Sequence, residues 1–269
     1  MEERVQQVKA FYDIDAQHEW DRLDRHPAEF ALTKHFIERY VKPGDSVLDV
    51  GGGPGRYALH FAAMGCNVRL LDLSAGNVAF ARAKAAELGL QLDARAGDAR
   101  VVDTLVDGLY DHVFLMGPLY HLFTEADRAA AVSACLRLLK PGGLLYVSFI
   151  SSYAGIIYYM KYSPEMLQAN PIEEEYAQYF IDDEPFNGEG FTQMYMIRQR
   201  DVLPFMAGFP LEKLHYFSQE GILAPCELTF MQQPPEVMEK WLTLSEQVCE
   251  REDLLSYAEH LMYIGRKTE

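Results

Sequence analysis

The sequence predicts an α/β fold whose sheet is mostly parallel and covered by helices on both faces. Short apolar runs alternate with longer amphipathic ones from residue 46 to residue 150, which is typical of strand–helix–strand units. The runs at 47–50 and 144–147 are nearly continuous in apolar character, as expected of strands that are buried on both sides. With 269 residues, 49% of them hydrophobic, the chain can bury a sizeable core without a disulfide or a metal.

Each element is predicted from the spacing of its apolar residues and from the residues at its ends. Helices are expected at residues 2–23, 28–41, 55–64, 74–88, 124–140, 201–207 and 235–251, and strands at 46–50, 68–72, 92–96, 110–116, 144–150, 213–217 and 260–265. Ser74 and Thr124 stand where an N-cap is needed, and Gly65 and Gly89 stand where helices close. The first helix can break near residues 13–15.

The alternation of strands and helices stops after Ile150. Residues 151–196 are crowded with tyrosine and phenylalanine, with acidic residues between them. We expect a partly helical insertion that leaves the sheet at the carboxyl end of a strand. Ligands of open α/β sheets bind beyond those ends. The insertion can therefore cap a site there, or it can pack as a core of its own.

Charge and cysteine content exclude several classes of protein. The 40 acidic residues outnumber the 24 lysines and arginines, which gives a net charge of −16, whereas nucleic acids and anionic membranes attract basic surfaces. The four cysteines stand apart, without the spacing of a zinc site or a disulfide framework. The first residues lack a signal peptide's apolar run, and no apolar stretch is long enough to span a membrane. We expect a cytoplasmic protein that holds no metal.

The sharpest motif is a glycine-rich turn within residues 47–57. Asp49 lies in the predicted strand, glycines follow at 51, 53 and 55, and a helix begins behind them. Glycine lets a ligand approach the backbone, and the helix N-terminus offers free N–H groups. Asp72 ends the next strand, where an acid can accept the ribose hydroxyls of a nucleotide-like ligand. A dinucleotide fingerprint needs glycine at its sixth position, which is Arg56 when counted from Gly51.

This turn and three later motifs resemble those of class I S-adenosylmethionine-dependent methyltransferases. The later matches are Leu70-Leu71-Asp72-Leu73-Ser74 at the second strand, Gly97-Asp98-Ala99 at the third, and Leu138-Leu139-Lys140-Pro141-Gly142-Gly143-Leu144-Leu145 before the fifth. Four motifs in the family's order make the resemblance specific over about residues 40–150. It implies a three-layer sandwich with a seven-stranded, mostly parallel sheet, to which the insertion adds a helical and aromatic cap.

The resemblance also implies roles for individual residues. The glycine turn would take the methionine moiety of S-adenosylmethionine, Asp72 the ribose hydroxyls, and Leu73, Asp98 and Ala99 the adenine; S-adenosylhomocysteine would be the product. The residues expected to contact the cofactor are Asp49, Gly51, Gly53, Gly55, Asp72, Leu73, Asp98, Ala99, Met116 and Tyr12. For Asp49 the alternative is that it only organises the glycine turn.

Candidate catalytic residues follow the predicted fourth strand, at residues 116–122, where the family places groups that face the substrate. If the acceptor must lose a proton, His121 is the first candidate for the general base and Tyr120 the second. Either side chain could equally be a core residue hydrogen-bonded to the backbone. Aromatic faces from the insertion would stabilise the sulfonium cation of the donor.

These observations divide the chain into four segments. They are an N-terminal helical lid (1–40), a cofactor-binding core (41–150), an insertion or cap (151–200) and a C-terminal part that completes the sheet (201–269). The acceptor is expected to be a small molecule, because the acidic charge and the enclosing insertion disfavour RNA. The alternatives are a tRNA or rRNA methyltransferase, a nicotinamide-dependent oxidoreductase and a non-catalytic cofactor-binding protein. The methylated atom and the oligomeric state stay open.

Overall fold

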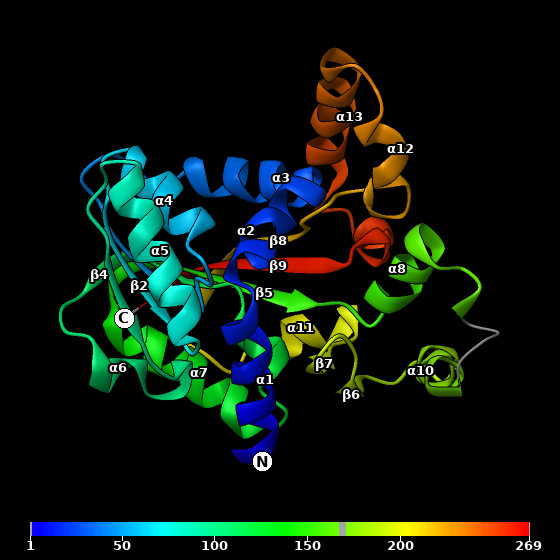
Figure 1. The fold of residues 1–269 in the computed structure, drawn as a ribbon, viewed down its shortest axis with the longest axis horizontal. Coiled ribbons are helices and arrows are strands. Elements are labelled where there is room, and N and C mark those ends of the chain that lie inside the picture. Colours follow the sequence, from blue (N-terminus) through cyan, green and yellow to red (C-terminus); the bar gives the residue numbers. More distant parts are fainter. Residues whose placement is uncertain (1, 167–170, 269) are drawn as a thin grey trace.

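The computed structural model describes residues 2–166 and 171–268 and is built on one seven-stranded sheet. The sheet has the order β3-β2-β1-β4-β5-β9-β8. Figure 1 shows the last three of these strands side by side. Its strands are β1 (Ser46–Val50), β2 (Asn67–Asp72), β3 (Asp93–Ala96), β4 (Tyr110–Leu115), β5 (Leu139–Ile150), β8 (Leu211–Ser218) and β9 (His260–Lys267). Strands β1 to β5 pair in parallel, and β9 is antiparallel to both β5 and β8. The predicted seven-stranded, mostly parallel sheet is therefore confirmed.

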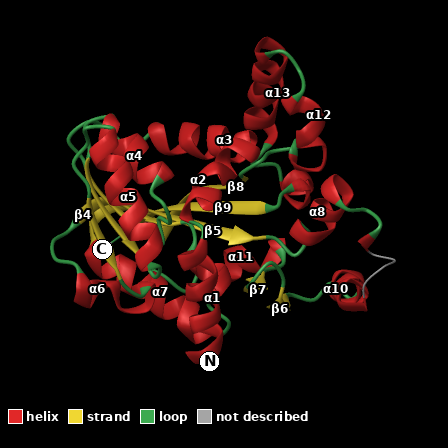
Figure 2. Ribbon diagram, viewed as in Figure 1, coloured by secondary structure: helices red, strands yellow, loops and turns green. Residues whose placement is uncertain are grey.

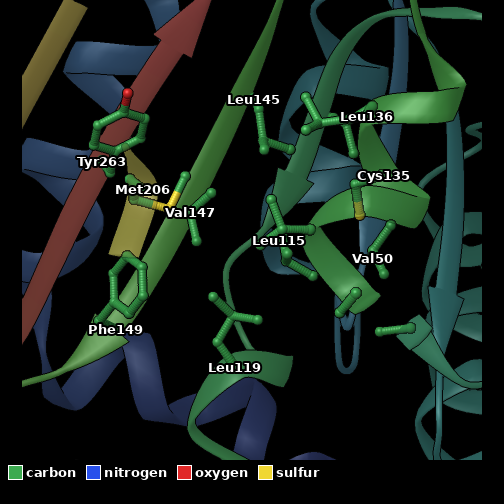
Figure 3. Packing of buried hydrophobic residues seen from close by; sticks show 14 of the residues in the cluster. Val50, Leu115, Leu119, Cys135, Leu136, Leu145, Val147, Phe149, Met206 and Tyr263 are labelled. Atoms are coloured by element: carbon green, nitrogen blue, oxygen red, sulfur yellow. The ribbon is translucent and has the colours of Figure 1, made fainter. Parts of the chain in front are cut away.

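Helices cover both faces of this sheet, so the molecule has three layers (Figure 2). One face carries α3 (Pro27–Glu38), α4 (Arg56–Ala63) and α5 (Ala75–Glu87); the other carries η1 (Ala99–Val101), α6 (Val102–Leu105), α7 (Glu125–Leu138) and α11 (Gln199–Met206). Phe36, Phe61 and Phe114 are buried on the first face. On the second face, Leu115 and Val147 belong to one buried cluster with Cys135 of α7 and Met206 of α11 (Figure 3).

The N-terminal segment forms two helices and not one. The first, α1 (Glu2–Ile14), ends at the predicted break, and α2 (Ala16–Arg25) begins where Asp15 caps it by accepting a hydrogen bond from the backbone N–H of His18 at 2.8 Å. Helix α1 contacts both α5 and the insertion. The first residues therefore lie over the carboxyl ends of the parallel strands.

The insertion is partly helical, as expected, and it also contains two strands. It contains α8 (Ala154–Tyr162) and α10 (Pro171–Ile181), followed by an antiparallel hairpin of β6 (Phe186–Glu189) and β7 (Gln193–Met196). This hairpin, absent from the predicted elements, encloses a small apolar core with Tyr176 and Met194. The remaining elements are η2 (Pro118–His121), η3 (Ala224–Cys226), α12 (Glu227–Met231), α13 (Pro235–Val248) and η4 (Glu252–Tyr257).

Residues Pro141–Gly143, which separate the predicted helix from the predicted fifth strand, form an irregularity within β5, because the pairing with β4 shifts register there and becomes regular from Leu144. All four cysteines are free thiols, three of them buried. Among the described residues, no helix is both long and apolar enough to cross a membrane.

Candidate active site

The glycine turn between β1 and α4 adopts a conformation that few other residues could hold. Gly51, Gly53 and Gly55 all have positive φ, at 72°, 56° and 91°, in the left-handed region that favours glycine. A Cβ on Gly51 would lie 2.4 Å from the ring of Pro118. The predicted spacing of 51, 53 and 55 thus matches the three positions where this backbone needs glycine.

Asp72 joins this turn to the end of β2. Its Oδ2 accepts a hydrogen bond from the backbone N–H of Gly53 at 2.8 Å, and its Oδ1 accepts one from Ser74 at 2.9 Å. The carboxyl group is buried, and this burial raises its pKa above the ordinary value despite the two backbone donors. The side chain is held rigidly at the carboxyl edge of the sheet, as the sequence predicted.

Asn77 lies directly beside Asp72. Its Nδ2 donates a hydrogen bond to Asp72 Oδ1 at 3.3 Å, and its own Oδ1 is buried without a hydrogen-bond partner among residues 2–166 and 171–268. An unpaired buried carbonyl is costly unless a ligand supplies the donor. Asp72 and Asn77 therefore place two acceptor groups side by side in the wall of one cavity. Sequence reasoning missed Asn77, although it lies one helical turn from the N-cap Ser74.

One cavity collects most of the predicted residues. Of these, Tyr12, Gly51, Gly53, Asp72, Leu73, Asp98, Ala99, Tyr120 and His121 line it, whereas Asp49, Gly55 and Met116 do not. Residues to which the sequence analysis gave no contact with a ligand complete the wall: Val5, Val8, Lys9, Glu19, Leu71, Ser74, Asn77, Gly97, Gly117, Pro118 and Leu122. Val5, Val8 and Lys9 share one face of α1. The apolar spacing of Val5 and Val8 is the sequence signal that could have indicated this part of the wall.

Asp49 lies beneath the turn and not in the cavity wall. The residue is buried, and its Oδ2 has no hydrogen-bond partner in the described part of the chain. Burial, reinforced by the nearby charge of Asp72, raises the pKa of Asp49 to about 7. A Cβ on Gly52 would lie 2.6 Å from that oxygen. This position agrees with the alternative that Asp49 organises the turn.

His121 is held at both ring nitrogens. Nδ1 lies 2.9 Å from the carbonyl oxygen of Gln193 on the hairpin, and Nε2 lies 2.9 Å from the hydroxyl of Tyr12 on α1. Burial lowers the pKa of the imidazole to about 4, although the bond to Gln193 opposes the shift. The ring is thus neutral near pH 7 and can accept a proton only through Nε2.

Tyr120 and Asp98 line the same cavity, and each has interaction partners of its own. The Tyr120 hydroxyl is 3.4 Å from the carbonyl oxygen of Met116, a long contact, and burial raises its pKa well above the ordinary value. Asp98 caps η1 through the backbone N–H of Arg100 at 2.9 Å and forms an ion pair with that side chain at 2.6 Å. Although burial opposes it, this pairing holds the pKa of Asp98 below its usual range.

Two separate segments close over the cavity. Arg4 of α1 donates from Nε to Gln193 Oε1 at 2.7 Å and from Nη2 to Asn187 Oδ1 at 3.0 Å. Phe11 of α1 packs on Phe191 of the hairpin loop, with ring centroids 5.6 Å apart, and both rings stay about half exposed. Helix α1 thus lines the cavity, and the hairpin contacts α1 through Arg4 and Phe11.

Comparison with known proteins identifies this site-bearing part of the chain. Residues 47–143 match the family described as "Methyltransferase domain". Over 113 residues the chain is 35% identical to a ubiquinone biosynthesis O-methyltransferase of Xanthomonas campestris pv. campestris, covering 42% of this chain and 46% of that protein. The corresponding protein of Xanthomonas axonopodis pv. citri is 36% identical over 117 residues, or 43% and 48%. The chain therefore spans about half the length of the curated relatives it matches.

Solved structures extend the likeness in fold to nearly the whole chain. One of them is a magnesium protoporphyrin IX methyltransferase from Synechocystis PCC 6803 with bound SAH, which has a TM-score of 0.59 at 13% identity. The alignment covers 98% of this chain and 99% of that chain. A [4+2]-cyclase, SpnF, has a TM-score of 0.53 at 20% identity over 88% and 80% of the two chains. Residues 47–143 match a methyltransferase domain, and the chain as a whole has the class I methyltransferase fold. Because a cyclase shares this fold, the fold alone does not fix the reaction.

Proposed function

We propose that this protein transfers a methyl group from S-adenosylmethionine to an oxygen of a small molecule that carries a hydroxyl group. The observation that carries the proposal is the cavity itself, which sets a ribose-type acceptor pair beside a buried neutral histidine. The curated relatives named above are O-methyltransferases, which supports oxygen as the methylated atom.

The donor half of the cavity is formed by the glycine turn and the end of β2. Asp72 and Asn77 accept from the ribose hydroxyls, Gly51 and Gly53 leave room for the methionine moiety, and Leu73, Asp98 and Ala99 face the adenine. When bound, the donor supplies a methyl group on a sulfonium sulfur. In the described part of the cavity wall, acidic side chains outnumber basic ones: Asp72, Asp98 and Glu19 line it together with one lysine, Lys9. This negative charge favours a cationic ligand.

The acceptor half lies between the lid and η2. Its polar side chains are the neutral His121 and the hydroxyls of Tyr12 and Tyr120, with Val5, Val8 and Leu122 around them. His121 is the general base, and Tyr120 positions the acceptor. Among the residues that the structure describes, this wall offers a carboxylate or phosphate acceptor no unpaired cation, because Lys9 already pairs with Asp13. These features favour a neutral acceptor small enough to fit beneath α1.

The segments work together in this assignment. Residues 1–40 form the lid, 41–150 the cofactor-binding core, 151–200 the cap that holds the lid, and 201–269 complete the sheet. The net charge of −16 makes RNA a poor acceptor. Free thiols are typical of a reducing compartment, so we assign the protein to the cytoplasm.

Isothermal titration calorimetry with S-adenosylhomocysteine and with NAD tests the donor assignment. We expect the first to bind and the second not to. Asp72→Asn should weaken binding at least tenfold, because one charge-assisted acceptor of a ribose hydroxyl is lost. Asp107→Asn, on an exposed loop, is the matched control and should bind normally. Binding of NAD without S-adenosylhomocysteine would reject the proposal, and tight, steeply salt-dependent RNA binding would favour the RNA alternative.

A further inference from the structure

We propose that Tyr12 and His121 form a proton relay in which Tyr12 contacts the acceptor and passes its own proton to His121. This inference rests on the proposed function and adds to it a catalytic residue on the lid. It also restricts the acceptor to a molecule that brings a proton on the atom to be methylated.

The hydrogen bonds around His121 fix the direction of the relay. The carbonyl oxygen of Gln193 can only accept, so the ring nitrogen 2.9 Å from it, Nδ1, carries the hydrogen. Nε2 then holds the free lone pair of a neutral imidazole. The Tyr12 hydroxyl, 2.9 Å from Nε2, is therefore the donor in that bond. Both nitrogens are occupied, which leaves the oxygen lone pairs of Tyr12 to receive a proton from the cavity.

The surroundings keep both groups in the protonation states that the relay needs. Burial holds the pKa of Tyr12 well above its ordinary value, so the phenol keeps its proton, and burial keeps His121 uncharged. The charged and titratable groups near Tyr12 are Glu19, Arg22, Asp72 and Tyr120. None of them forms a hydrogen bond with either member of the pair among the described residues.

The acceptor oxygen uses a lone pair to bond to the methyl carbon, and the bonding pair of the broken carbon–sulfur bond stays on sulfur. The proton of the acceptor hydroxyl moves to Tyr12 Oη while the Tyr12 proton moves to His121 Nε2. The products of this step are a methyl ether, a restored tyrosine and an imidazolium whose Nδ1–H still donates to Gln193. Release to water after the lid opens returns His121 to its neutral form.

The three groups of the relay come from three separate parts of the chain. Tyr12 belongs to α1, His121 to η2 and the Gln193 carbonyl to β7. Arg4 ties α1 to the hairpin through Gln193 and Asn187, so the relay is complete only when lid and hairpin are both closed on the core. Closure also keeps water from the relay.

The test combines nuclear magnetic resonance with turnover of phenols. Protein labelled with ¹⁵N-histidine should show the Nδ1–H tautomer for His121 in the wild type between pH 5.5 and pH 8, without any added ligand. Tyr12→Phe removes the donor to Nε2 and should raise the pKa of His121. Tyr158→Phe, at an exposed tyrosine of α8, is the matched control and should leave the His121 signals unchanged. S-adenosylhomocysteine titration of each variant checks that the donor site is intact.

Turnover is followed as S-adenosylhomocysteine release from two acceptors, 4-methylphenol and 4-nitrophenol, at pH 8. We expect Tyr12→Phe and His121→Asn to lower kcat for 4-methylphenol by about 100-fold, the typical loss of a general base. The loss should be less than about fivefold for 4-nitrophenol, which is largely ionised at this pH and needs no base. Equal losses for the two phenols, or an Nε2–H tautomer in the wild type, would overturn the relay.

The remaining outcomes separate this inference from the proposed function. If the wild type binds S-adenosylhomocysteine but methylates neither phenol, the relay to a phenol acceptor is overturned while the donor assignment stands. If it does not bind S-adenosylhomocysteine, the proposed function fails, and the tautomer measurement still decides the hydrogen-bond direction on which the relay depends.

Discussion

Asp13 accepts a hydrogen bond from the hydroxyl of Ser74 at 2.6 Å, which connects the end of the lid helix to the edge of the cofactor cavity. The same Ser74 oxygen caps α5 by accepting from the backbone N–H of Asn77 at 3.1 Å. The backbone N–H of Gly76 adds a bond to Asp13 at 3.2 Å. The position of the lid is therefore tied to the helix start that carries Asn77, one of the two proposed ribose acceptors.

Removing this tie should loosen the lid without unfolding the core. Asp13→Ala leaves Ser74 as the cap of α5 but removes its acceptor on α1, so α1 should detach more often. We expect S-adenosylhomocysteine to bind about 5- to 30-fold more weakly, which corresponds to one or two lost hydrogen bonds. Calorimetry measures the affinity, with Asp107→Ala as the control. An unchanged affinity would mean that the lid position does not affect the donor site.

Ligand binding should in turn order the lid. Lids have low local stability and tighten around their ligands, so S-adenosylhomocysteine should slow amide hydrogen exchange in residues 8–20 and in the hairpin at 186–196. The glycine turn should be protected as well. Exchange followed by mass spectrometry resolves these segments. Protection confined to the turn, Asp72 and Asp98 would show an open site, and the case for a small acceptor would lose its structural support.

Much of the fold could be predicted because local signals and the topology agree. Alternating strands and helices with clear caps, such as Ser74 and Thr124, define the parallel half of the sheet. The glycine spacing 51, 53 and 55 indicated the turn, since each position needs a positive φ. The hairpin in the insertion was missed because its strands have only four residues each and lie in a segment where aromatic residues outweigh any periodic pattern.

The part of the site that could not be predicted depends on contacts between distant segments. The bond from Tyr12 to His121 spans 109 positions, and that from His121 to Gln193 spans 72. Lys161 of the insertion is almost fully buried, with Glu227 at 3.4 Å and Glu259 as its partners. Spacing along the chain carries no information about such pairs, because only the folded sheet brings its carboxyl edge, the lid and the cap together.

A second buried network, around His260, should make stability depend on pH. His260 Nδ1 lies 2.6 Å from Glu220 and 3.8 Å from Glu29, which Arg22 also contacts. Burial alone would lower its pKa, but Glu29 and Glu220 outweigh that effect and raise the pKa from 6.5 to about 9. The folded state therefore binds this proton more tightly than the unfolded state. The resulting stabilisation is complete below pH 6.5 and is lost as the pH rises to about 9.

The size of this effect is at most about 3 kcal/mol, from the difference between the two pKa values. Urea unfolding at pH 6, 7.5 and 9 measures it. His260→Gln should flatten the decline in stability between pH 6.5 and pH 9, whereas His35→Gln, an exposed histidine, should keep it. Parallel slopes for the wild type and His260→Gln would show that other groups cause the decline.

The raised pKa of Asp49 leads to a prediction about the charge of the donor. Burial and the neighbouring Asp72 raise that pKa to about 7, so about half of the molecules carry the proton at pH 7. A cation bound above the glycine turn stabilises the ionised carboxylate and lowers its pKa. S-adenosylmethionine carries a sulfonium and an ammonium, whereas S-adenosylhomocysteine carries only the ammonium. We therefore expect S-adenosylmethionine to release more of this proton on binding, up to about half a proton per site.

Calorimetry in two buffers of different ionisation enthalpy, phosphate and Tris, measures the release. At pH 7 the binding enthalpy of S-adenosylmethionine should differ between the buffers, and the difference should shrink at pH 8.5, where Asp49 is already ionised in the free protein. In Asp49→Asn it should vanish while binding persists, because this residue lies beneath the turn and not in the cavity wall. If the wild-type enthalpy at pH 7 is the same in both buffers, the positive charge of the donor does not reach Asp49. That side chain would then act on the glycine turn alone.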